Sequence, residues 1–248
     1  MLEKILPGAV ACAEAFDDPP DAVLHPQEEA VISRAVEKRR REFRTVRHCA
    51  RQALRELGLP PAAVLPGEHR EPLWPPGVVG SLTHCTGYRG AAVARSRDLL
   101  TVGIDAEPHQ PLPPDVLEAI ALAEEQIRIG EMAAAHGAAH WDRILFCAKE
   151  TVYKAWFPLT QRWLGFHDAA VTIEPAASNP AVIINPAEGT FSARLLVRGP
   201  TIAGHALAGF DGRWLISDGL VITAIAVPAT HLGHAPTGEN QGSTTPPG

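Results

Sequence analysis

Two acidic side chains follow an apolar run near the middle of the chain. Val102-Gly103-Ile104 is succeeded by Asp105 and Glu107, with Ala106 between them. Because side chains alternate along a strand, we expect both carboxylates to project from the same face. Paired hard oxygen ligands suit Mg²⁺, which completes its octahedron with water and substrate phosphate. From the spacing alone, two solvated acids at the end of an edge strand are the commoner explanation, because Asp-x-Glu occurs often, so the pair needs support from elsewhere in the chain.

Further along the chain, Glu150 and Lys154 stand four residues apart on an expected helix, whose apolar side includes Trp141, Val152 and Trp156. Such a pair can be a surface ion pair worth about 0.2–0.5 kcal/mol. Alternatively, Glu150 is a third metal ligand or a base, and Lys154 stabilises phosphate charge in a transition state. The two residues alone leave both interpretations open.

Hydroxyl and imidazole groups gather in Gly80-Ser81-Leu82-Thr83-His84-Cys85. The segment lacks the Gly-x-Ser-x-Gly turn of many hydrolases, and a nucleophile and its base rarely lie three residues apart on one strand. Ser81, Thr83 and His84 are better suited to holding a phosphate or a nucleotide. Without further context, a structural role is the default interpretation of His84.

Arginines recur on the first long helix expected from the sequence. Arg40, Arg44, Arg47 and Arg51 follow a 4,3,4 spacing and form one row beside the apolar face. The row can be solvated charge, or it can bind phosphates, because the arginine fork matches phosphate oxygens.

The elements that carry these groups alternate between helical and strand patterns. Helices are predicted over 26–57, 117–135 and 140–157; Gly58 and Pro60 end the first, and Pro158 ends the third. Strands are predicted over 78–82, 90–94, 99–104, 169–173, 191–197, 205–210, 213–217 and 220–227, the last five as an antiparallel meander. This order predicts an α+β fold with two halves of comparable size, 1–103 and 104–227. No short-period repeat relates the halves in sequence.

The last segment, 228–248, is rich in Pro, Gly and Thr and is predicted to be a disordered tail. Its His231 and His234 are too few to predict a metal site.

Composition narrows the classes of function. The 248 residues are 46% hydrophobic, enough for a sizeable core, and the formal net charge of -6 disfavours nucleic acids and anionic membranes as partners. Four irregularly spaced cysteines predict reduced thiols rather than disulfides or zinc. Glu3, Pro7 and Glu14 interrupt the weakly apolar N-terminus, so a secretory signal is not expected. We therefore expect a cytoplasmic protein.

Taken together, these segments resemble the Sfp-type 4′-phosphopantetheinyl transferases, most closely the actinobacterial single-chain kind. The family signature is (V/I)GxDxE followed by (F/W)(S/C/T)xKExxxK. Both motifs are complete here, as Val102-Gly103-Ile104-Asp105-Ala106-Glu107 and Phe146-Cys147-Ala148-Lys149-Glu150-Thr151-Val152-Tyr153-Lys154. The resemblance extends over nearly the whole chain apart from the tail, and includes Lys38-Arg39-Arg40, Phe43 to Arg51, Gly80 to Cys85, His140-Trp141-Asp142-Arg143 and Ala155 to Thr160.

The resemblance implies two similar α/β lobes in a pseudo-twofold arrangement, with a metal site at their interface. It implies transfer of the phosphopantetheine of coenzyme A to a serine of an apo acyl, peptidyl or aryl carrier protein, with release of 3′,5′-ADP. Asp105, Glu107 and Glu150 would hold Mg²⁺, or Mn²⁺ in its place. Glu150 would also help to deprotonate the serine, Lys154 would stabilise the transferred phosphate, and Lys149 would lie by the phosphates. The adenosine 3′-phosphate and the diphosphate would be bound by Arg39, Arg47, Ser81, Thr83 and His84.

One segment departs from the family pattern. Relatives usually carry a basic residue and a Gly-x-Pro turn before the Ser-x-Thr-His-Cys strand, whereas residues 65–72 read LPGEHREP. The basic residue expected near Pro66 is missing, and His69 and Arg70 are the candidates to replace it. The apolar residues Trp163, Leu164 and Phe166 could line a pantetheine channel, meet the carrier or belong to the core.

Three other functions would use some of the same residues. A non-catalytic coenzyme A-binding regulator would not need Glu150 and Lys154 together. A coenzyme A pyrophosphatase would differ only in using water in place of the carrier serine. A nucleic-acid-binding helix would be expected to interleave aromatic residues with the arginine row, and this one does not. Because two fused halves could build a two-lobed site within one chain, a monomer is expected.

Overall fold

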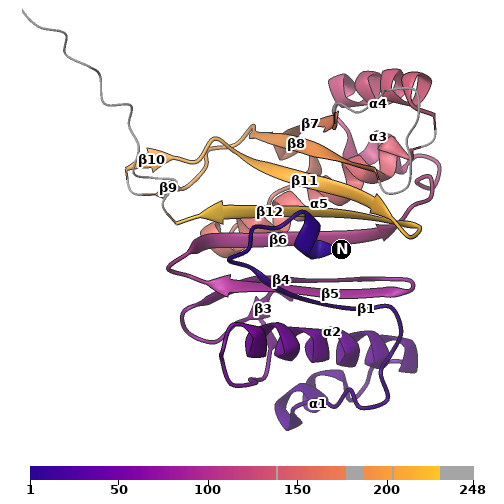
Figure 1. Ribbon diagram of the computed structural model, residues 1–248. Coiled ribbons are helices and arrows are strands. Elements are labelled where there is room, and N and C mark those ends of the chain that lie inside the picture. Colours follow the sequence, from indigo (N-terminus) through magenta and orange to yellow (C-terminus); the bar gives the residue numbers. More distant parts are fainter. Residues whose placement is uncertain (138, 177–186, 203, 230–248) are drawn as a thin grey trace, which may run out of the picture.

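In the described part of the chain, two larger antiparallel sheets each have a long helix packed on one face, and two further sheets have two short strands each (Figure 1). The computed structural model describes residues 1–248 except 138, 177–186, 203 and 230–248. Helices and antiparallel strands occur in both halves, so the expected α+β class is confirmed. Within the described residues, no helix is long and apolar enough to cross a membrane. All four cysteines are free, as expected.

The first half is a three-stranded sheet covered by one helix. After a 3₁₀ turn at Leu2–Lys4, the chain forms β1 (Ala11–Ala15), α1 (Pro26–Ile32), α2 (Glu37–Glu56), the short pair β2 (Leu65–Pro66) and β3 (Pro72–Leu73), β4 (Val78–Cys85) and β5 (Tyr88–Arg95). The strand order is β1-β5-β4. Small residues on α2, among them Cys49, Ala50 and Ala53, pack on Ala91 and Val93 of β5. Small side chains at this contact let the helix approach the sheet closely, which fixes its position.

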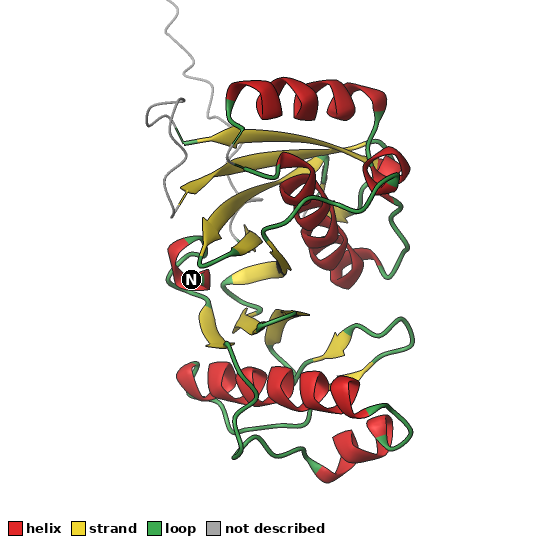
Figure 2. Ribbon diagram, turned by 90° about the vertical axis from the view of Figure 1, so that its right-hand side faces the viewer, coloured by secondary structure: helices red, strands yellow, loops and turns green. Residues whose placement is uncertain are grey.

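The second half is a five-stranded sheet with strand order β6-β12-β11-β8-β7. Its elements are β6 (Leu99–Pro108), α3 (Val116–Ile120), α4 (Ala123–Ala135), α5 (Trp141–Thr160), a 3₁₀ turn at Phe166–Asp168, β7 (Ala169–Pro175), β8 (Ala187–Leu195), β9 (Thr201–Ile202), β10 (His205–Ala206), β11 (Gly209–Ser217) and β12 (Leu220–Pro228). The expected antiparallel meander is confirmed. Figure 2 shows α5 crossing one face of this sheet, and its buried Trp141, Ile144 and Trp156 belong to the core formed there.

Several predicted boundaries are wrong. The helix predicted over 26–57 is broken between Ile32 and Glu37, because the backbone at Val36 is extended (ψ 155°). The helix predicted over 117–135 breaks at Ala121 and Leu122, where the Leu122 N–H donates to the Glu125 carboxylate at 2.7 Å. The predicted strand 205–210 is divided, because His205–Ala206 form β10 beside β9 and Gly209 begins β11, which includes all of the predicted strand 213–217. The sequence patterns did not predict β1.

Pro158 does not end the third helix, which continues to Thr160. Proline lacks an N–H and crowds the preceding turn, but α5 ends only two residues later, so little regular helix is lost. The left-handed Gln161 (φ 52°) then terminates the helix.

A shared apolar cluster joins the two halves. It combines Leu2, Ile5 and Tyr88 from the first half with Ile104 and Ile222 from the second. The predicted boundary at 103/104 falls inside β6. The predicted tail lies outside the described residues, together with His231 and His234, except that Pro228 still belongs to β12 and Ala229 donates its N–H to the Asp98 carbonyl at 3.0 Å.

Candidate active site

Asp105 and Glu107 lie on the face of β6 that α5 covers. In the sheet they stand opposite Thr223 and Val221, which are alternate residues of β12, so they share one face as expected. Gly103 allows the helix to come close, because a Cβ there would lie 2.5 Å from the Thr151 carbonyl oxygen. The Thr101 hydroxyl donates to the Ala155 carbonyl at 3.0 Å and fixes the same approach. This contact brings the carboxylates of β6 against the middle of α5.

The strongest hydrogen bonds of the Asp105 carboxylate go to one of its oxygens, and the Cys147 thiol is also close to this carboxylate. Asp105 Oδ1 accepts hydrogen bonds from Lys154 Nζ at 2.7 Å and from the Thr83 hydroxyl at 3.0 Å. Its Oδ2 is buried and has no hydrogen-bond partner among the residues that the structure describes. An unpaired buried carboxylate oxygen is costly unless a cation or another ligand satisfies it. Asp105 is therefore a suitable ligand for a hard cation.

Glu107 and Glu150 share the same crowded negative environment. Burial raises the pKa of Glu107, and the Asp105 charge raises it further, although Arg143 and Lys154 oppose this. Burial and then Asp105 also raise the pKa of Glu150, while Lys154 opposes. The three carboxylates thus interact electrostatically, but within the described residues no three acidic, histidine or cysteine side chains form a ready-made cluster for an ion. A divalent cation would relieve their mutual repulsion, so the donor set fits one.

A cavity of about 760 Å³ extends from Glu150 and Lys154 to the first half of the chain. Its lining includes four residues predicted to bind coenzyme A, namely Arg39, Arg47, Ser81 and His84. Arg39 donates to His84 Nε2 at 2.8 Å, so this nitrogen is an acceptor and the imidazole is neutral. Burial and then Arg39 lower the pKa of His84 accordingly.

Arg47 belongs to the wall of this cavity rather than to a solvated arginine row. Its Nε donates to the Val64 carbonyl at 3.1 Å, and its guanidinium lies 3.5 Å from the centroid of the Phe43 ring. Burial lowers its pKa to about 10. Arg51, also predicted in the row, is bound to the buried Glu28 at 2.8 Å. This arrangement therefore does not favour phosphate binding by the whole arginine row.

Two regions of the chain match family descriptions. Residues 27–94 match the 4′-phosphopantetheinyl transferase N-terminal domain, and residues 101–208 match the 4′-phosphopantetheinyl transferase superfamily. The chain belongs to the 4′-phosphopantetheinyl transferases. Among its relatives is 4′-phosphopantetheinyl transferase PptT of Mycobacterium tuberculosis, 51% identical over 92% of this chain and 98% of the relative. Svp of Streptomyces mobaraensis is 50% identical over 92% and 90%, and Npt of Nocardia iowensis is 52% identical over 91% and 99%. Both are named 4′-phosphopantetheinyl transferases too.

In this transferase, Ser81 and Thr83 connect the two sheets. Strand β4 lies beside β6, but β4 pairs with β5 and β6 pairs with β12. The Ser81 hydroxyl accepts the Ile104 N–H at 3.1 Å, and the Thr83 hydroxyl accepts the Ala106 N–H at 3.1 Å. Both hydroxyls are buried and engaged in this way, and only Ser81 also lines the cavity.

The structure does not bring Lys149 to the cavity of this transferase. Its Nζ donates to the carbonyls of Phe166 and Ala169, at 2.6 and 2.9 Å, and forms a 2.9 Å ion pair with Glu125. Each partner's side chain is only 2% exposed. The other Glu125 oxygen accepts the Val171 N–H at 2.7 Å. Lys149 thus ties α4, α5 and β7 together, and we leave it out of the proposed phosphate contacts.

Arg143, which has no predicted role, is joined to Glu107 in the structure. Its Nη1 donates to Glu107 Oε2 at 3.1 Å. Arg143, Glu150 and Lys154 are spaced seven and four apart, which places them on one face of a helix. This spacing in the sequence is enough to predict that Arg143 faces the site together with Glu150 and Lys154.

The departing segment near Pro66 forms the β2–β3 hairpin over the cavity. His69 and Arg70, the candidates for the missing basic contact, both line the cavity, and the His69 ring packs edge-on against Phe157 at 5.3 Å between centroids. The apolar run after α5 divides: Leu164 is buried, whereas Trp163 is 76% exposed and lies 5.1 Å from the Tyr153 ring.

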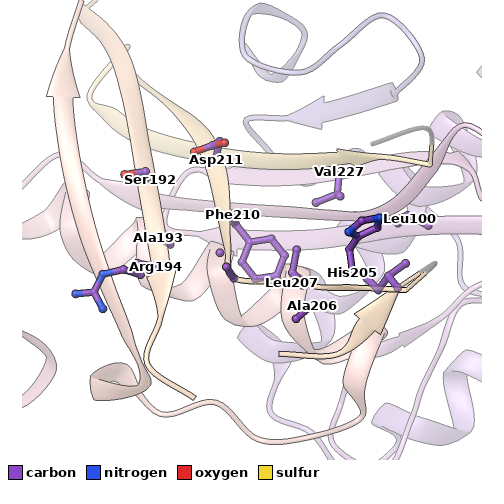
Figure 3. A pocket seen from close by; sticks show the side chains of 13 residues that line it. Leu100, Ser192, Ala193, Arg194, His205, Ala206, Leu207, Phe210, Asp211 and Val227 are labelled. Atoms are coloured by element: carbon purple, nitrogen blue, oxygen red, sulfur yellow. The ribbon is translucent and has the colours of Figure 1, made fainter. Parts of the chain in front are cut away.

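A second cavity of about 530 Å³ lies beside the β9–β10 hairpin (Figure 3). Its lining includes Leu100, Phe210 and Val227, with the polar Arg194 and Asp211 at β8 and β11. Leu100 is near the start of β6, whereas Asp105 and Glu107 are near its end. None of the predicted site residues lines this cavity, so it is separate from the carboxylates.

Proposed function

We propose that this protein transfers the 4′-phosphopantetheine group of coenzyme A to a serine of an apo acyl, peptidyl or aryl carrier protein, with Mg²⁺ or Mn²⁺ and with release of 3′,5′-ADP. Membership of the transferase family supports the reaction type. The observation that carries the metal assignment is the buried, unpartnered Asp105 Oδ2 beside two glutamates with raised pKa values.

Asp105, Glu107 and Glu150 are the residues that would hold the cation. When bound, it would neutralise charge on the diphosphate, which is the main requirement of phosphoryl-type transfer. The orphaned Asp105 oxygen and the mutual repulsion of the carboxylates both favour its binding.

Lys154 and Glu150 would act on the reacting groups. Lys154 Nζ has three donors, of which the Ile104 carbonyl takes one at 3.1 Å and Asp105 takes another, which leaves one for a phosphate oxygen. Glu150 lines the same cavity and would accept the proton of the carrier serine. The serine oxygen forms a bond to the pantetheine-linked phosphorus as the bond from this phosphorus to the ADP oxygen breaks.

The other end of the cavity would hold the nucleotide part of coenzyme A. Arg39 and the neutral His84 present donors there, and the buried Arg47 adds a fixed positive charge. Removing Arg47 should therefore raise KM for coenzyme A more than it lowers kcat. Ser81 and Thr83 would contribute by fixing β4 against β6.

Both halves contribute to this one cavity, which supports a monomeric enzyme. Each half also places one long helix on an antiparallel sheet, so we infer a pseudo-twofold relation between them. We place the boundary between the lobes at the β5–β6 turn rather than at 103/104, because β6 pairs with β12 along its length. The net charge of -6 disfavours nucleic acids and anionic membranes as partners, and we propose a cytoplasmic location.

The test is the intact mass of apo carrier proteins after incubation with this protein, coenzyme A and Mg²⁺, with an EDTA control. We expect one phosphopantetheine to be added to the carrier only when metal is present, and no addition with Glu150→Gln. Cleavage of coenzyme A without addition to any acyl, peptidyl or aryl carrier would instead indicate a pyrophosphatase. No cleavage and no addition from folded protein that binds coenzyme A would indicate a regulator.

A further inference from the structure

Arg143 joins the site to the segment that follows Glu107 through three side-chain hydrogen bonds. It lies in the first turn of α5, and its side chain is 13% exposed. Its three guanidinium nitrogens have three different acceptors: Nη1 donates to Glu107 Oε2 at 3.1 Å, Nε to the Gln110 carbonyl at 3.0 Å, and Nη2 to the Pro111 carbonyl at 3.0 Å.

The rest of the first turn of α5 holds the same segment. The Asp142 carboxylate accepts the Leu112 N–H at 2.7 Å, and the His140 N–H donates to His109 Nε2 at 3.1 Å. The residues that follow Glu107 are therefore fixed to the helix that carries Glu150 and Lys154. Because the guanidinium is planar, the two carbonyl bonds fix its plane and so fix the direction of its bond to Glu107.

Two effects of Arg143 on a bound cation oppose each other. Its positive charge repels the cation, while its hydrogen bond orients the Glu107 carboxylate and leaves the second carboxylate oxygen for coordination. Glu107 is 24% exposed on its side chain, so water screens part of the repulsion. Hydrogen-bond partners that orient metal ligands commonly change metal affinity by about 10–100-fold. Removing Arg143 therefore separates the two effects, because lost orientation weakens cation binding whereas lost repulsion strengthens it.

We propose that Arg143 is a positioning residue that holds Glu107 in the orientation needed for the divalent cation, and thereby sets the affinity of the enzyme for this cation. The inference rests on the proposed function, because it takes Glu107 as a metal ligand.

The test measures Mn²⁺ binding directly, by the loss of the free-ion electron paramagnetic resonance signal in the presence of full-length protein and coenzyme A. For Arg143→Met we expect affinity to fall about 10–100-fold, with partial recovery in Arg143→Lys, which keeps the charge but not the planar fork. Arg213→Met is the matched control, because Arg213 forms only an exposed ion pair with Glu188 at 3.5 Å. The kcat of Arg143→Met should recover at saturating Mg²⁺, with KM for coenzyme A unchanged.

A double-mutant cycle with Glu107→Gln identifies the route of the effect. If Arg143 acts through Glu107, adding Arg143→Met to Glu107→Gln should weaken Mn²⁺ binding no further. Equal or tighter binding by Arg143→Met and by Arg143→Lys would overturn the inference alone. Failure of the unaltered protein to bind Mn²⁺ would overturn the metal assignment in the proposed function, and the inference with it.

Discussion

At the scale of single residues, the clustered carboxylates of the candidate site lower the free energy of unfolding at neutral pH. Burial and the Asp105 charge both raise the pKa of Glu150 above its usual 4.5, so the folded chain binds a proton here more readily than the unfolded chain. The protonated Glu150 carboxyl therefore adds to the free energy of unfolding below pH 4.5. This contribution is lost as the pH rises from 4.5 through the raised pKa of the folded state. Clustered like charges of this kind are typical of functional sites and reduce stability.

We predict that Glu150→Gln is more stable than the unaltered protein at pH 7 without metal, because it removes a charge from a crowded site. The difference should shrink as pH falls towards 4.5, since the native carboxyl then becomes protonated. Saturating Mg²⁺ should stabilise the unaltered protein, by about 2.7 kcal/mol at 100 times Kd, and the variant much less. Thermal unfolding at several pH values, with and without Mg²⁺, checks this. A variant that is less stable at every pH would show that Glu150 supports the fold instead.

Lys149 provides the second prediction at this scale. Lys149→Met removes one partner of a buried ion pair and leaves Glu125 charged, so we expect a loss of about 3–5 kcal/mol in urea unfolding. The double variant with Glu125→Gln should regain part of this loss. Arg213→Met, in an exposed pair, should cost at most about 1 kcal/mol. If Lys149→Met is fully stable but binds coenzyme A more weakly, Lys149 contacts the phosphates of coenzyme A instead.

The sequence motifs predicted which carboxylates belong to the site. They did not predict in which direction the neighbouring side chains point. Each residue of a helix turns about 100°, so Lys149 and Lys154 point about 140° apart and cannot both face one cavity. The sequence therefore contained the information needed to separate them. The contacts of Ser81 and Thr83 could not be predicted in this way. Their partners are backbone N–H groups of β6, about twenty residues away in the chain, and a local sequence pattern does not reveal such a contact.

At the scale of elements, the approach of α5 to β6 determines the geometry of the site. The strand pattern predicted β6 and the helical pattern predicted α5, but neither predicted their distance. That distance depends on Gly103, because any side chain there would meet the backbone of α5. The apolar pattern of the strand does not show this requirement. The helix break before α4 was missed because it depends on a contact distant in the sequence. Glu125 stabilises the break before α4 through its bond to the Leu122 N–H, and its burial depends on Lys149 and Val171.

Gly103→Ala tests this approach. The added Cβ would meet the Thr151 carbonyl oxygen at 2.5 Å and the Ala155 nitrogen at 2.9 Å, and both are backbone atoms that cannot move aside cheaply. We expect a loss of about 1–3 kcal/mol and a larger fall in kcat than in coenzyme A affinity, because α5 is displaced from the carboxylates. In Gly130→Ala on α4, a Cβ meets nothing within 4 Å, so stability should rise by up to about 1 kcal/mol. Equal effects of the two changes would contradict the close-contact explanation.

At the scale of the whole molecule, the two halves are joined by apolar and polar contacts together. The shared cluster that includes Leu2, Tyr88, Ile104 and Ile222 makes separate unfolding of either half expose apolar surface. Composition predicted a core of sufficient size, and the order of elements predicted two halves. Neither predicted that the core would be continuous between them, because this depends on the N-terminal residues packing against strands from both sheets.

Thr83 links this interface to the site, since its hydroxyl accepts the Ala106 N–H and donates to Asp105. Thr83→Val keeps the shape but leaves a buried N–H unpaired, so we expect a loss of about 1–3 kcal/mol and weaker Mn²⁺ binding. Thr83→Ser should retain most of both. Urea unfolding followed by circular dichroism and by tryptophan fluorescence should still give one coincident transition, because the apolar cluster continues to couple the halves. Two separated transitions in Thr83→Val would show that the hydroxyls, rather than the cluster, hold the halves together.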